Sequence, residues 1–182
     1  MSQIYIICGI DTDCGKTFIT GLLAKQCINK GKQCITQKLV QTGCSGSIAD
    51  DILEHRRIMQ IPLLPEDYNH ITNPYIFKFP ASPHLAAELE STIIDITKLH
   101  ESIQNLSNKY EVVLCEAAGG ICVPLTSSYL FSDFLQECGY PIILVSSSKL
   151  GSINHTLLSI EFCKTHNIIY YCMNSNIMCF AK

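Results

Sequence analysis

The stretch that decides the fold is IYIICGIDTDCGKTFIT, residues 4–20. A short apolar run rich in β-branched residues ends at Gly9, a polar loop follows, and Gly15-Lys16-Thr17 closes the loop where apolar residues begin to recur at helical spacing. A buried strand, a glycine-bounded loop and a helix in this order predict a phosphate-binding loop, in which backbone N–H groups and the helix N-terminus hold anions.

The spacing of this loop differs from the common pattern G-x-x-x-x-G-K-S/T. Ile10 occupies the position of the first glycine, and Gly9 comes one residue early. In a functional loop Lys16 reaches the terminal phosphates and the Thr17 hydroxyl binds magnesium. The alternative is an ordinary turn between a strand and a helix, in which Gly15 fits a tight bend and Lys16 is solvated.

The composition predicts a single compact domain over residues 1–182. With 47% hydrophobic and 16% charged residues, the chain has enough apolar side chains for a sizeable core. A formal net charge of -3 supplies no overall basic field, which disfavours nucleic acid and anionic lipid as partners. Charges or turn residues interrupt every apolar run before the roughly 18 residues that a membrane helix needs, so no membrane association is expected.

The N-terminus and the cysteines predict a cytoplasmic protein. Residues 1–13 have no basic segment before the short apolar run, which argues against a secretory signal. The 11 cysteines are odd in number and irregular in spacing, and most lie in apolar runs. Free buried thiols are therefore expected in place of disulfides, and the spacing does not match a zinc site.

Apolar strands alternate with helical segments along the whole chain. Expected strands occupy residues 3–8, 33–40, 110–120, 140–148 and 168–176, and expected helices occupy residues 17–30, 49–59, 82–90, 96–106 and 154–167. This rhythm predicts an α/β fold with a mostly parallel central sheet flanked by helices, a Rossmann-like three-layer sandwich of the P-loop type. In such a sheet, ligands bind beyond the carboxyl ends of the strands.

Charged residues stand where several of these strands end. Lys38 closes the second strand and could hold a phosphate or an anionic substrate, although an ordinary surface lysine explains it as well. Glu116 follows VVLC at the end of a core strand, where an acidic residue assists magnesium; its alternative is a glutamate facing water. Asp50 and Asp51 offer a further magnesium ligand, or simply favourable charges at a helix start.

A second candidate loop is SKLGSINH, residues 148–155. It lies after a strand and before a helix, so Gly151 and the following amides could hold a carboxylate. Asn154 as an ordinary helix N-cap explains the same residues without a ligand. His155 is interpreted as a helix residue and not as a catalytic base.

Taken together, these segments resemble the dethiobiotin synthetases, ATP-dependent ligases of the P-loop superfamily. The family's loop has the form G-T-D-T-x-x-G-K-T, with the early glycine that is found here, and Ile10 replaces the more usual threonine. Further matches, in order along nearly the whole chain, are Lys38 in a lysine-proline segment, NPYIFKFPASPH at residues 73–84, EAAGGICVPL at residues 116–125 and KLGSINH at residues 149–155.

The resemblance implies a reaction in which 7,8-diaminopelargonate takes up CO₂ as a carbamate, ATP phosphorylates the carbamate, and the second amine closes the ureido ring. It also implies a homodimer that requires ATP and Mg²⁺. Lys16 and Lys38 would stabilise the transferring phosphoryl group, with Thr12 and Thr42 at the carbamate. The implied nucleotide residues are Asp13, Cys14, Gly15, Lys16, Thr17, Phe18, Glu116, Gly119 and, for adenine, Asn174; the magnesium ligands are Thr17, Asp50 and Glu116; and the substrate residues are Lys38, Thr42, Ser82, Gly151, Ser152 and Asn154.

The chain departs from the family pattern at several positions. The proline after the family's lysine is Leu39, the glycine after its glutamate is Ala117, and its loop glutamate is the shorter Asp13. Members of the family also continue beyond the segment that matches Lys182, with further contacts to the base and a closing helix. Two other functions stay open: a P-loop ATPase switch, disfavoured because the additional lysine of partition ATPases is absent from the loop, and a nucleotide-binding homologue without turnover.

Overall fold

A computed structural model describes residues 2–174 and 177–181, with side chains up to residue 173. The strands are β1 (Gln3–Gly9), β2 (Cys34–Lys38), β3 (Val40–Gln41), β4 (Tyr75–Ile76), β5 (Val112–Gly120), β6 (Pro124–Thr126), β7 (Tyr129–Leu130), β8 (Ile142–Ser146), β9 (Tyr170–Asn174) and β10 (Ile177–Ala181). The helices are α1 (Lys16–Asn29), α2 (Asp50–Met59), α3 (Pro65–Tyr68), α4 (Pro83–Leu89), α5 (Ile96–Ser107), α6 (Phe131–Cys138) and α7 (Ser152–Thr165).

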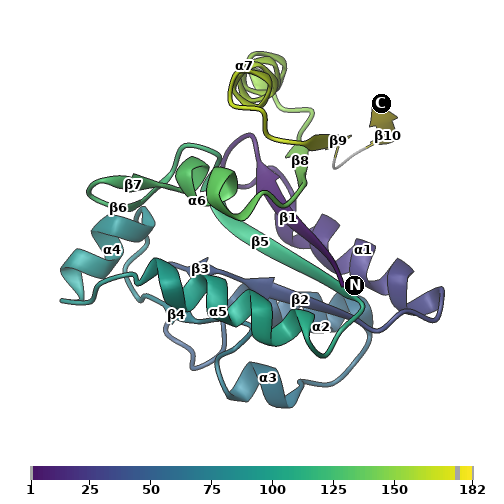
Figure 1. Cartoon of the computed structure of the whole chain (residues 1–182), viewed down its shortest axis with the longest axis vertical. Helices are drawn as coiled ribbons and strands as arrows, with labels where there is room; N and C mark the ends of the chain where they lie inside the picture. Colours follow the sequence, from purple (N-terminus) through teal and green to yellow (C-terminus); the bar gives the residue numbers. More distant parts are fainter. Residues whose placement is uncertain (1, 175–176, 182) are drawn as a thin grey trace.

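Within the described residues the main sheet has six strands in the order β10-β9-β8-β1-β5-β2 (Figure 1). All neighbouring strands in it run parallel except β10, which is antiparallel to β9. The pairs β3-β4 and β6-β7 form two small separate sheets. The predicted α/β fold with a mostly parallel central sheet is therefore confirmed. The strand expected at residues 168–176 is present as β9, but it is not the last strand of the chain, because β10 follows it.

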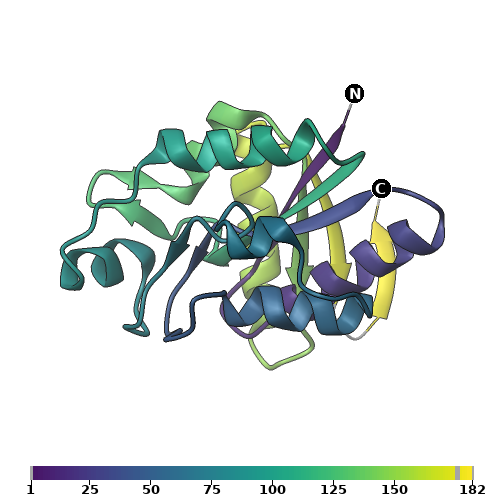
Figure 2. The same ribbon diagram turned by 90° about the horizontal axis from the view of Figure 1, so that it is seen from below.

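The alternation of side chains along the central strands divides the core between the two faces of the sheet. Ile6 of β1 packs in one cluster with residues of α5 and α6, such as Leu99 and Phe134. Its neighbour Ile7 packs in a second cluster with Ile19 of α1. Figure 2 shows α5 and α2 on opposite sides of the strands, so the central strands are covered by helices on both faces.

Several elements begin or end differently from the sequence expectation. The helix expected at 154–167 begins at Ser152, and Gly151 is its N-cap with a positive φ of 92°. The interpretation of Asn154 as an N-cap is therefore wrong, because this residue lies inside the first helical turn. The β6-β7 hairpin and α6 occupy a stretch for which no element was expected.

Helices in the described ranges are all too short or too polar to cross a membrane. The cysteines whose side chains the structure describes are free thiols, and most of them are buried. The expectation of free, buried cysteines is therefore confirmed for this part of the chain.

Candidate active site

The path of the loop between β1 and α1 accounts for a glycine at position 9, one residue before the usual position. A Cβ atom at Gly9 would lie 2.6 Å from the Cys14 Sγ and 2.8 Å from both the Asp11 carbonyl oxygen and the Lys16 Nζ. The loop thus folds back directly over residue 9, and only glycine leaves space for it. Gly15 is the N-cap of α1 with a φ of 97°, a left-handed conformation that favours glycine.

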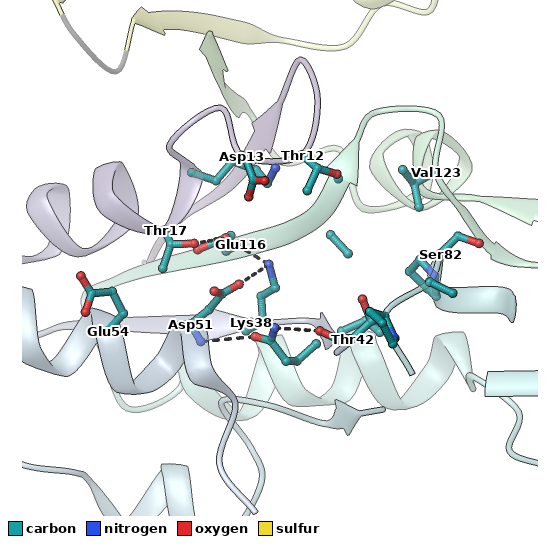
Figure 3. A pocket seen from close by; sticks show the side chains of 18 of the residues that line it. Thr12, Asp13, Thr17, Lys38, Thr42, Asp51, Glu54, Ser82, Glu116 and Val123 are labelled. Atoms are coloured by element: carbon teal, nitrogen blue, oxygen red, sulfur yellow. Dashed lines mark hydrogen bonds and ion pairs between the residues drawn. The ribbon is translucent and has the colours of Figure 1, made fainter. Parts of the chain in front are cut away.

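A cavity of about 830 Å³ opens beside this loop at the carboxyl ends of β2 and β5. In Figure 3, Thr12 of the loop and Thr42 after β3 lie on opposite walls of the cavity. The residues expected from the sequence that line the cavity are Thr12, Asp13, Gly15, Lys16, Thr17, Phe18, Lys38, Thr42, Ser82, Glu116 and Gly119. The structure therefore brings together residues from the loop, β2, β5 and the segment before α4.

Two opposite charges face each other across neighbouring strands on the floor of the cavity. Lys38 of β2 and Glu116 of β5 are paired in register, so their side chains lie side by side. The Lys38 Nζ is 3.0 Å from the Glu116 Oε1 and 2.6 Å from the Asp51 Oδ2 of α2 (Figure 3). Only 5% of Lys38 and 1% of Glu116 is exposed. The alternatives of an ordinary surface lysine and of a glutamate facing water are therefore wrong.

This pairing sets the charges of both groups. Burial alone raises the pKa of Glu116, but the Lys38 ammonium and the hydrogen bond from His55 outweigh it and hold the pKa well below its usual range. Burial alone lowers the pKa of Lys38, but Glu116 and Asp51 outweigh it and the pKa is raised. Both side chains are consequently charged at neutral pH, and the ammonium is fixed inside the cavity.

The oxygen atoms around Lys38 fit a magnesium ion. The Thr17 Oγ1 lies 3.0 Å from the Glu116 Oε1, and the Asp51 Oδ2 lies 2.6 Å from the Lys38 ammonium. A hydroxyl and two carboxylates are hard oxygen donors, and Mg²⁺ at phosphate sites uses one or two carboxylates together with substrate oxygens. Among the described residues, groups of three or more His, Cys, Asp or Glu that could hold a metal are absent.

Asp51 replaces Asp50 in this arrangement. Asp51 lines the cavity and pairs with Lys38, whereas Asp50 is exposed at the first position of α2. The two residues are adjacent on a helix, about 100° apart around its axis, so only one of them can face the cavity. The structure therefore places Asp51, and not the expected Asp50, at the cavity, which makes Asp51 the candidate metal ligand of the pair.

Other expected residues lie outside the cavity. Cys14 is buried beneath the loop, with its sulfur 4.0 Å from the Lys16 Nζ. Gly151, Ser152 and Asn154 lie at the start of α7, where Lys149 donates a hydrogen bond to the Asp13 carbonyl oxygen at 3.2 Å. The side chain of Asn174, expected at the adenine, lies outside the described residues.

Sequence reasoning missed two side chains that support the site. His55 is fully buried one helical turn after Asp51, and its Nε2 lies 2.8 Å from the Glu116 Oε2. Gln41 of β3 accepts a hydrogen bond from the Asp51 backbone N–H at 3.3 Å and so caps α2, whose N-cap residue Ala49 has no polar side chain. The i, i+4 spacing of Asp51 and His55 was the available signal, since it places both on one face of a helix.

Comparisons with known proteins identify the family of this chain. A family model described as an AAA domain matches residues 3–173. A protein of Chlorobaculum tepidum named ATP-dependent dethiobiotin synthetase is 50% identical over 166 residues, which cover 91% of this chain and 69% of that protein. A dethiobiotin synthetase of Haemophilus influenzae is 50% identical over 168 residues, covering 92% of this chain and 87% of that protein.

Solved structures with a similar fold are more distant in sequence. A ParA family ATPase of Chlorobium tepidum has a TM-score of 0.57 at 11% identity, covering 96% of this chain and 74% of that chain. The MinD cell division protein of Aquifex aeolicus has a TM-score of 0.53 at 17% identity, covering 95% and 69%. At these identities the likeness shows the fold alone, so the family is decided by the sequence relatives: the chain belongs to the dethiobiotin synthetase family.

Proposed function

We propose that this chain is an ATP-dependent dethiobiotin synthetase that acts on 7,8-diaminopelargonate and CO₂. One amine of the substrate forms a carbamate with CO₂, and the carbamate oxygen takes the γ-phosphoryl group of ATP, which leaves ADP. The second amine then attacks the carbamate carbon, the ureido ring closes and phosphate leaves. The products are dethiobiotin, ADP and phosphate.

The observation that carries this proposal is one cavity in which the phosphate-binding loop faces a second, buried lysine. Carbamate and triphosphate are both anions, so bringing them into line requires fixed positive charge and aligned dipoles. Lys16 and the amides at the start of α1 provide these on one side. Lys38 provides a second cation on the floor, held in position by Glu116 and Asp51.

We assign the polar side chains of the cavity walls to the substrate. Thr12 and Thr42 lie on opposite walls of the cavity and would hydrogen-bond the carbamate. Ser82 lines the same cavity before α4, and its Oγ is 3.0 Å from the His84 Nδ1, which orients the hydroxyl. Asp13, Gly15, Phe18 and Gly119 border the space for the nucleotide.

Magnesium would be held by Thr17, Asp51 and Glu116. When bound, the ion neutralises phosphate charge and helps to align the transferring phosphoryl group. Burial raises the pKa of Glu116, but the Lys38 ammonium and the hydrogen bond from His55 outweigh burial and lower that pKa, so the carboxylate is ionised and available as a ligand at neutral pH.

We further propose that the enzyme is a cytoplasmic homodimer that associates through α7. The helix exposes Ile153, Leu157 and Leu158, and the exposed Leu150 precedes it; 80% of the surface of Ile153 is in contact with solvent. Exposed apolar groups gathered on one helix indicate a protein interface. Pairing of two copies would carry Gly151 and the amides that follow it toward the other copy's cavity, where they would bind the substrate carboxylate.

Free thiols in the described residues agree with a reducing compartment, as proposed for a cytoplasmic protein.

The decisive experiment is a coupled ADP-release assay with purified protein, MgATP and bicarbonate, with and without 7,8-diaminopelargonate. We expect ADP release to depend on diaminopelargonate and to fall by at least about a hundredfold in Lys16→Ala and Lys38→Ala, because each change removes a cation from the transition state. Glu54→Gln, at the rim of the cavity, is a matched control that should retain turnover.

The same assay separates the alternatives. ADP release that does not respond to diaminopelargonate would indicate a P-loop ATPase switch. Nucleotide binding by calorimetry without ADP release would indicate a binding protein that has lost turnover. Either result would overturn the synthetase assignment.

A further inference from the structure

His55 is a buried polar side chain whose only partner among the described residues is Glu116. It lies on α2, its ring is fully buried, and its Nε2 is 2.8 Å from the Glu116 Oε2. An ionised carboxylate can only accept hydrogen bonds, so the Nε2 of His55 is the donor. The ring therefore carries a proton on the nitrogen that faces Glu116.

The other ring nitrogen of His55 indicates that the histidine is present for its hydrogen bond to Glu116. Its Nδ1 is buried, and in the described part of the chain it finds no hydrogen-bond partner. A buried polar atom without a partner destabilises a fold, and an apolar side chain of similar size would fill the same space without that cost. The hydrogen bond to Glu116 is the contact that such an apolar side chain would lack.

This hydrogen bond divides the two oxygens of Glu116 between separate tasks. Oε2 is occupied by His55. Oε1 faces the Thr17 hydroxyl and the Lys38 ammonium, each at 3.0 Å, and so points toward the cavity. Because the hydrogen bond from His55 holds Oε2, the carboxylate cannot rotate freely. Oε1 therefore stays directed at the proposed metal position.

Helix α2 couples this orientation to a second metal ligand. Asp51 and His55 are one turn apart on the same helix, so the segment that supplies the Asp51 carboxylate also supplies the group that orients Glu116. A displacement of α2 would move both together. One helix thereby sets the position of the Asp51 carboxylate and of the ring that orients Glu116 of β5.

We propose that His55 is a positioning residue for the magnesium site, which orients Glu116 so that Oε1 is presented to the ion. This inference rests on the proposed function of Glu116 as a ligand. Groups that orient metal ligands change metal affinity by about 10–100-fold when they are removed. Loss of the His55 hydrogen bond is therefore expected to weaken magnesium binding by that factor and to leave the contacts of the loop with nucleotide phosphates in place.

The test measures the affinity for ADP by calorimetry, once in the presence of Mg²⁺ and once in the presence of EDTA. The affinity with Mg²⁺ divided by the affinity with EDTA is the effect of the metal and is called the ratio below. In His55→Leu we expect the ratio to fall by about 10–100-fold, with the affinity in EDTA unchanged. His55→Gln should restore most of the ratio because its amide nitrogen can occupy the place of Nε2. His55→Asn, whose amide is too short to reach Glu116, should not restore it, and serves if the leucine variant does not fold.

Two further variants make the result specific. Ile52→Ala removes a fully buried side chain from the same helix and is expected to lower the melting temperature without changing the ratio, so it controls for general destabilisation of α2. Glu116→Gln should abolish the effect of Mg²⁺. If Glu116→Gln retains that effect, the proposed magnesium site itself is wrong; if Glu116→Gln loses it while His55→Leu and His55→Asn retain it, only the role of His55 is overturned.

Discussion

Gly9 illustrates how a single residue position is fixed by packing and not by backbone conformation. The atoms that a Cβ would meet belong to the loop that folds over it, including the sulfur of Cys14 and the carbonyl oxygen of Asp11. The early glycine is therefore required by this loop, whereas Ile10, at the usual glycine position, packs its side chain against the core.

The first prediction concerns Gly9→Ala. The added methyl group must displace the loop backbone, because the Asp11 oxygen would lie only 2.8 Å away. We expect a loss of about 1–3 kcal/mol in the free energy of unfolding, as for other overpacked sites. We also expect ATP affinity to fall by about tenfold or more, since each 1.4 kcal/mol of lost amide contacts is a factor of ten. Urea denaturation and calorimetry with ATP measure the two effects.

Gly31→Ala is the control for that experiment. Gly31 has a positive φ of 77° with open space around its Cβ position, and it lies beyond the far end of α1. Alanine there strains the backbone by about 1–2 kcal/mol without touching the loop, so ATP affinity should not change. Equal losses of ATP affinity in the two alanine variants would contradict the local explanation.

At this scale the sequence identifies residues that interrupt an apolar pattern. Lys38 and Glu116 could be predicted because each places a charge at the end of a buried strand. Asp50 and Asp51 could not be distinguished, because the choice depends on the rotation of α2 about its axis. The spacing from Asp51 places His55 on the same face of α2, but its contact with Glu116, 61 positions away along the chain, could not be predicted.

Among the elements, α2 has the largest effect on the geometry of the site, because it carries Asp51 and His55. Its Arg56 side chain attaches the helix to the rest of the fold. The Arg56 guanidinium makes two hydrogen bonds to the Asp67 carboxylate, at 2.9 and 2.7 Å, and a third to the Thr36 hydroxyl of β2 at 2.7 Å. Arg56 and Asp67 are buried, so the pair is shielded from solvent. The network ties α2 to the sheet one residue after His55.

The second prediction follows from the pKa of Asp67. Burial alone raises this pKa, but the Arg56 hydrogen bonds outweigh it and the pKa is lowered. A lowered pKa contributes stability that is present above the unfolded-state value of about 3.9 and is lost as pH falls through the folded-state value. We expect Asp67→Asn to lose about 3 kcal/mol of unfolding free energy at pH 7, and the difference from the unmodified protein to shrink below about pH 4.

Denaturation by urea at a series of pH values between 7 and 3 measures this difference. Glu54→Gln is the control, because Glu54 also pairs with an arginine, Arg57, but on the exposed surface of the same helix. Surface pairs contribute little, so this variant should follow the unmodified protein at every pH. A difference for Asp67→Asn that stays constant down to pH 3 would show that ionisation of this residue does not stabilise the fold.

The elements that the sequence predicted are the long periodic ones. Helices α1, α2 and α5 and the central strands have patterns that repeat often enough to be recognised. The β6-β7 hairpin has strands of only three and two residues, too short for an alternating pattern to appear. The start of α7 was placed too late because Gly151, in a left-handed conformation, caps the helix without a polar side chain.

For the whole molecule, the order of the strands determines where the chemistry lies. Because β5 lies between β1 and β2, Glu116 is placed next to Lys38 and opposite the loop that follows β1. The alternation of strands and helices was enough to predict a parallel sheet and a site at its carboxyl edge. It could not predict which strands are neighbours, and therefore could not predict the Lys38–Glu116 contact.

The third prediction concerns association of two molecules through α7. Ile153 and Leu157 lie one turn apart on the exposed side of this helix, with 80% and 61% of their surfaces in solvent. Burying both against a second copy removes apolar surface from water, at about 25 cal/mol for each Å². We expect the protein to sediment at about twice its chain mass of 20.3 kDa, and the double change Ile153→Asp with Leu157→Asp to give monomers.

Leu89→Asp provides the matched control, since Leu89 of α4 is 55% exposed but lies on a different helix, so this change should leave the dimer intact. The monomeric α7 variant should still bind ATP, because the loop and its cavity are built from one chain, but its KM for diaminopelargonate should rise if α7 of the second copy binds the substrate carboxylate. Analytical ultracentrifugation and steady-state kinetics measure both properties. Sedimentation of the unmodified protein as a monomer would show that the carboxylate must be bound within a single chain. Dimers that persist in the double variant would show that α7 is not the interface.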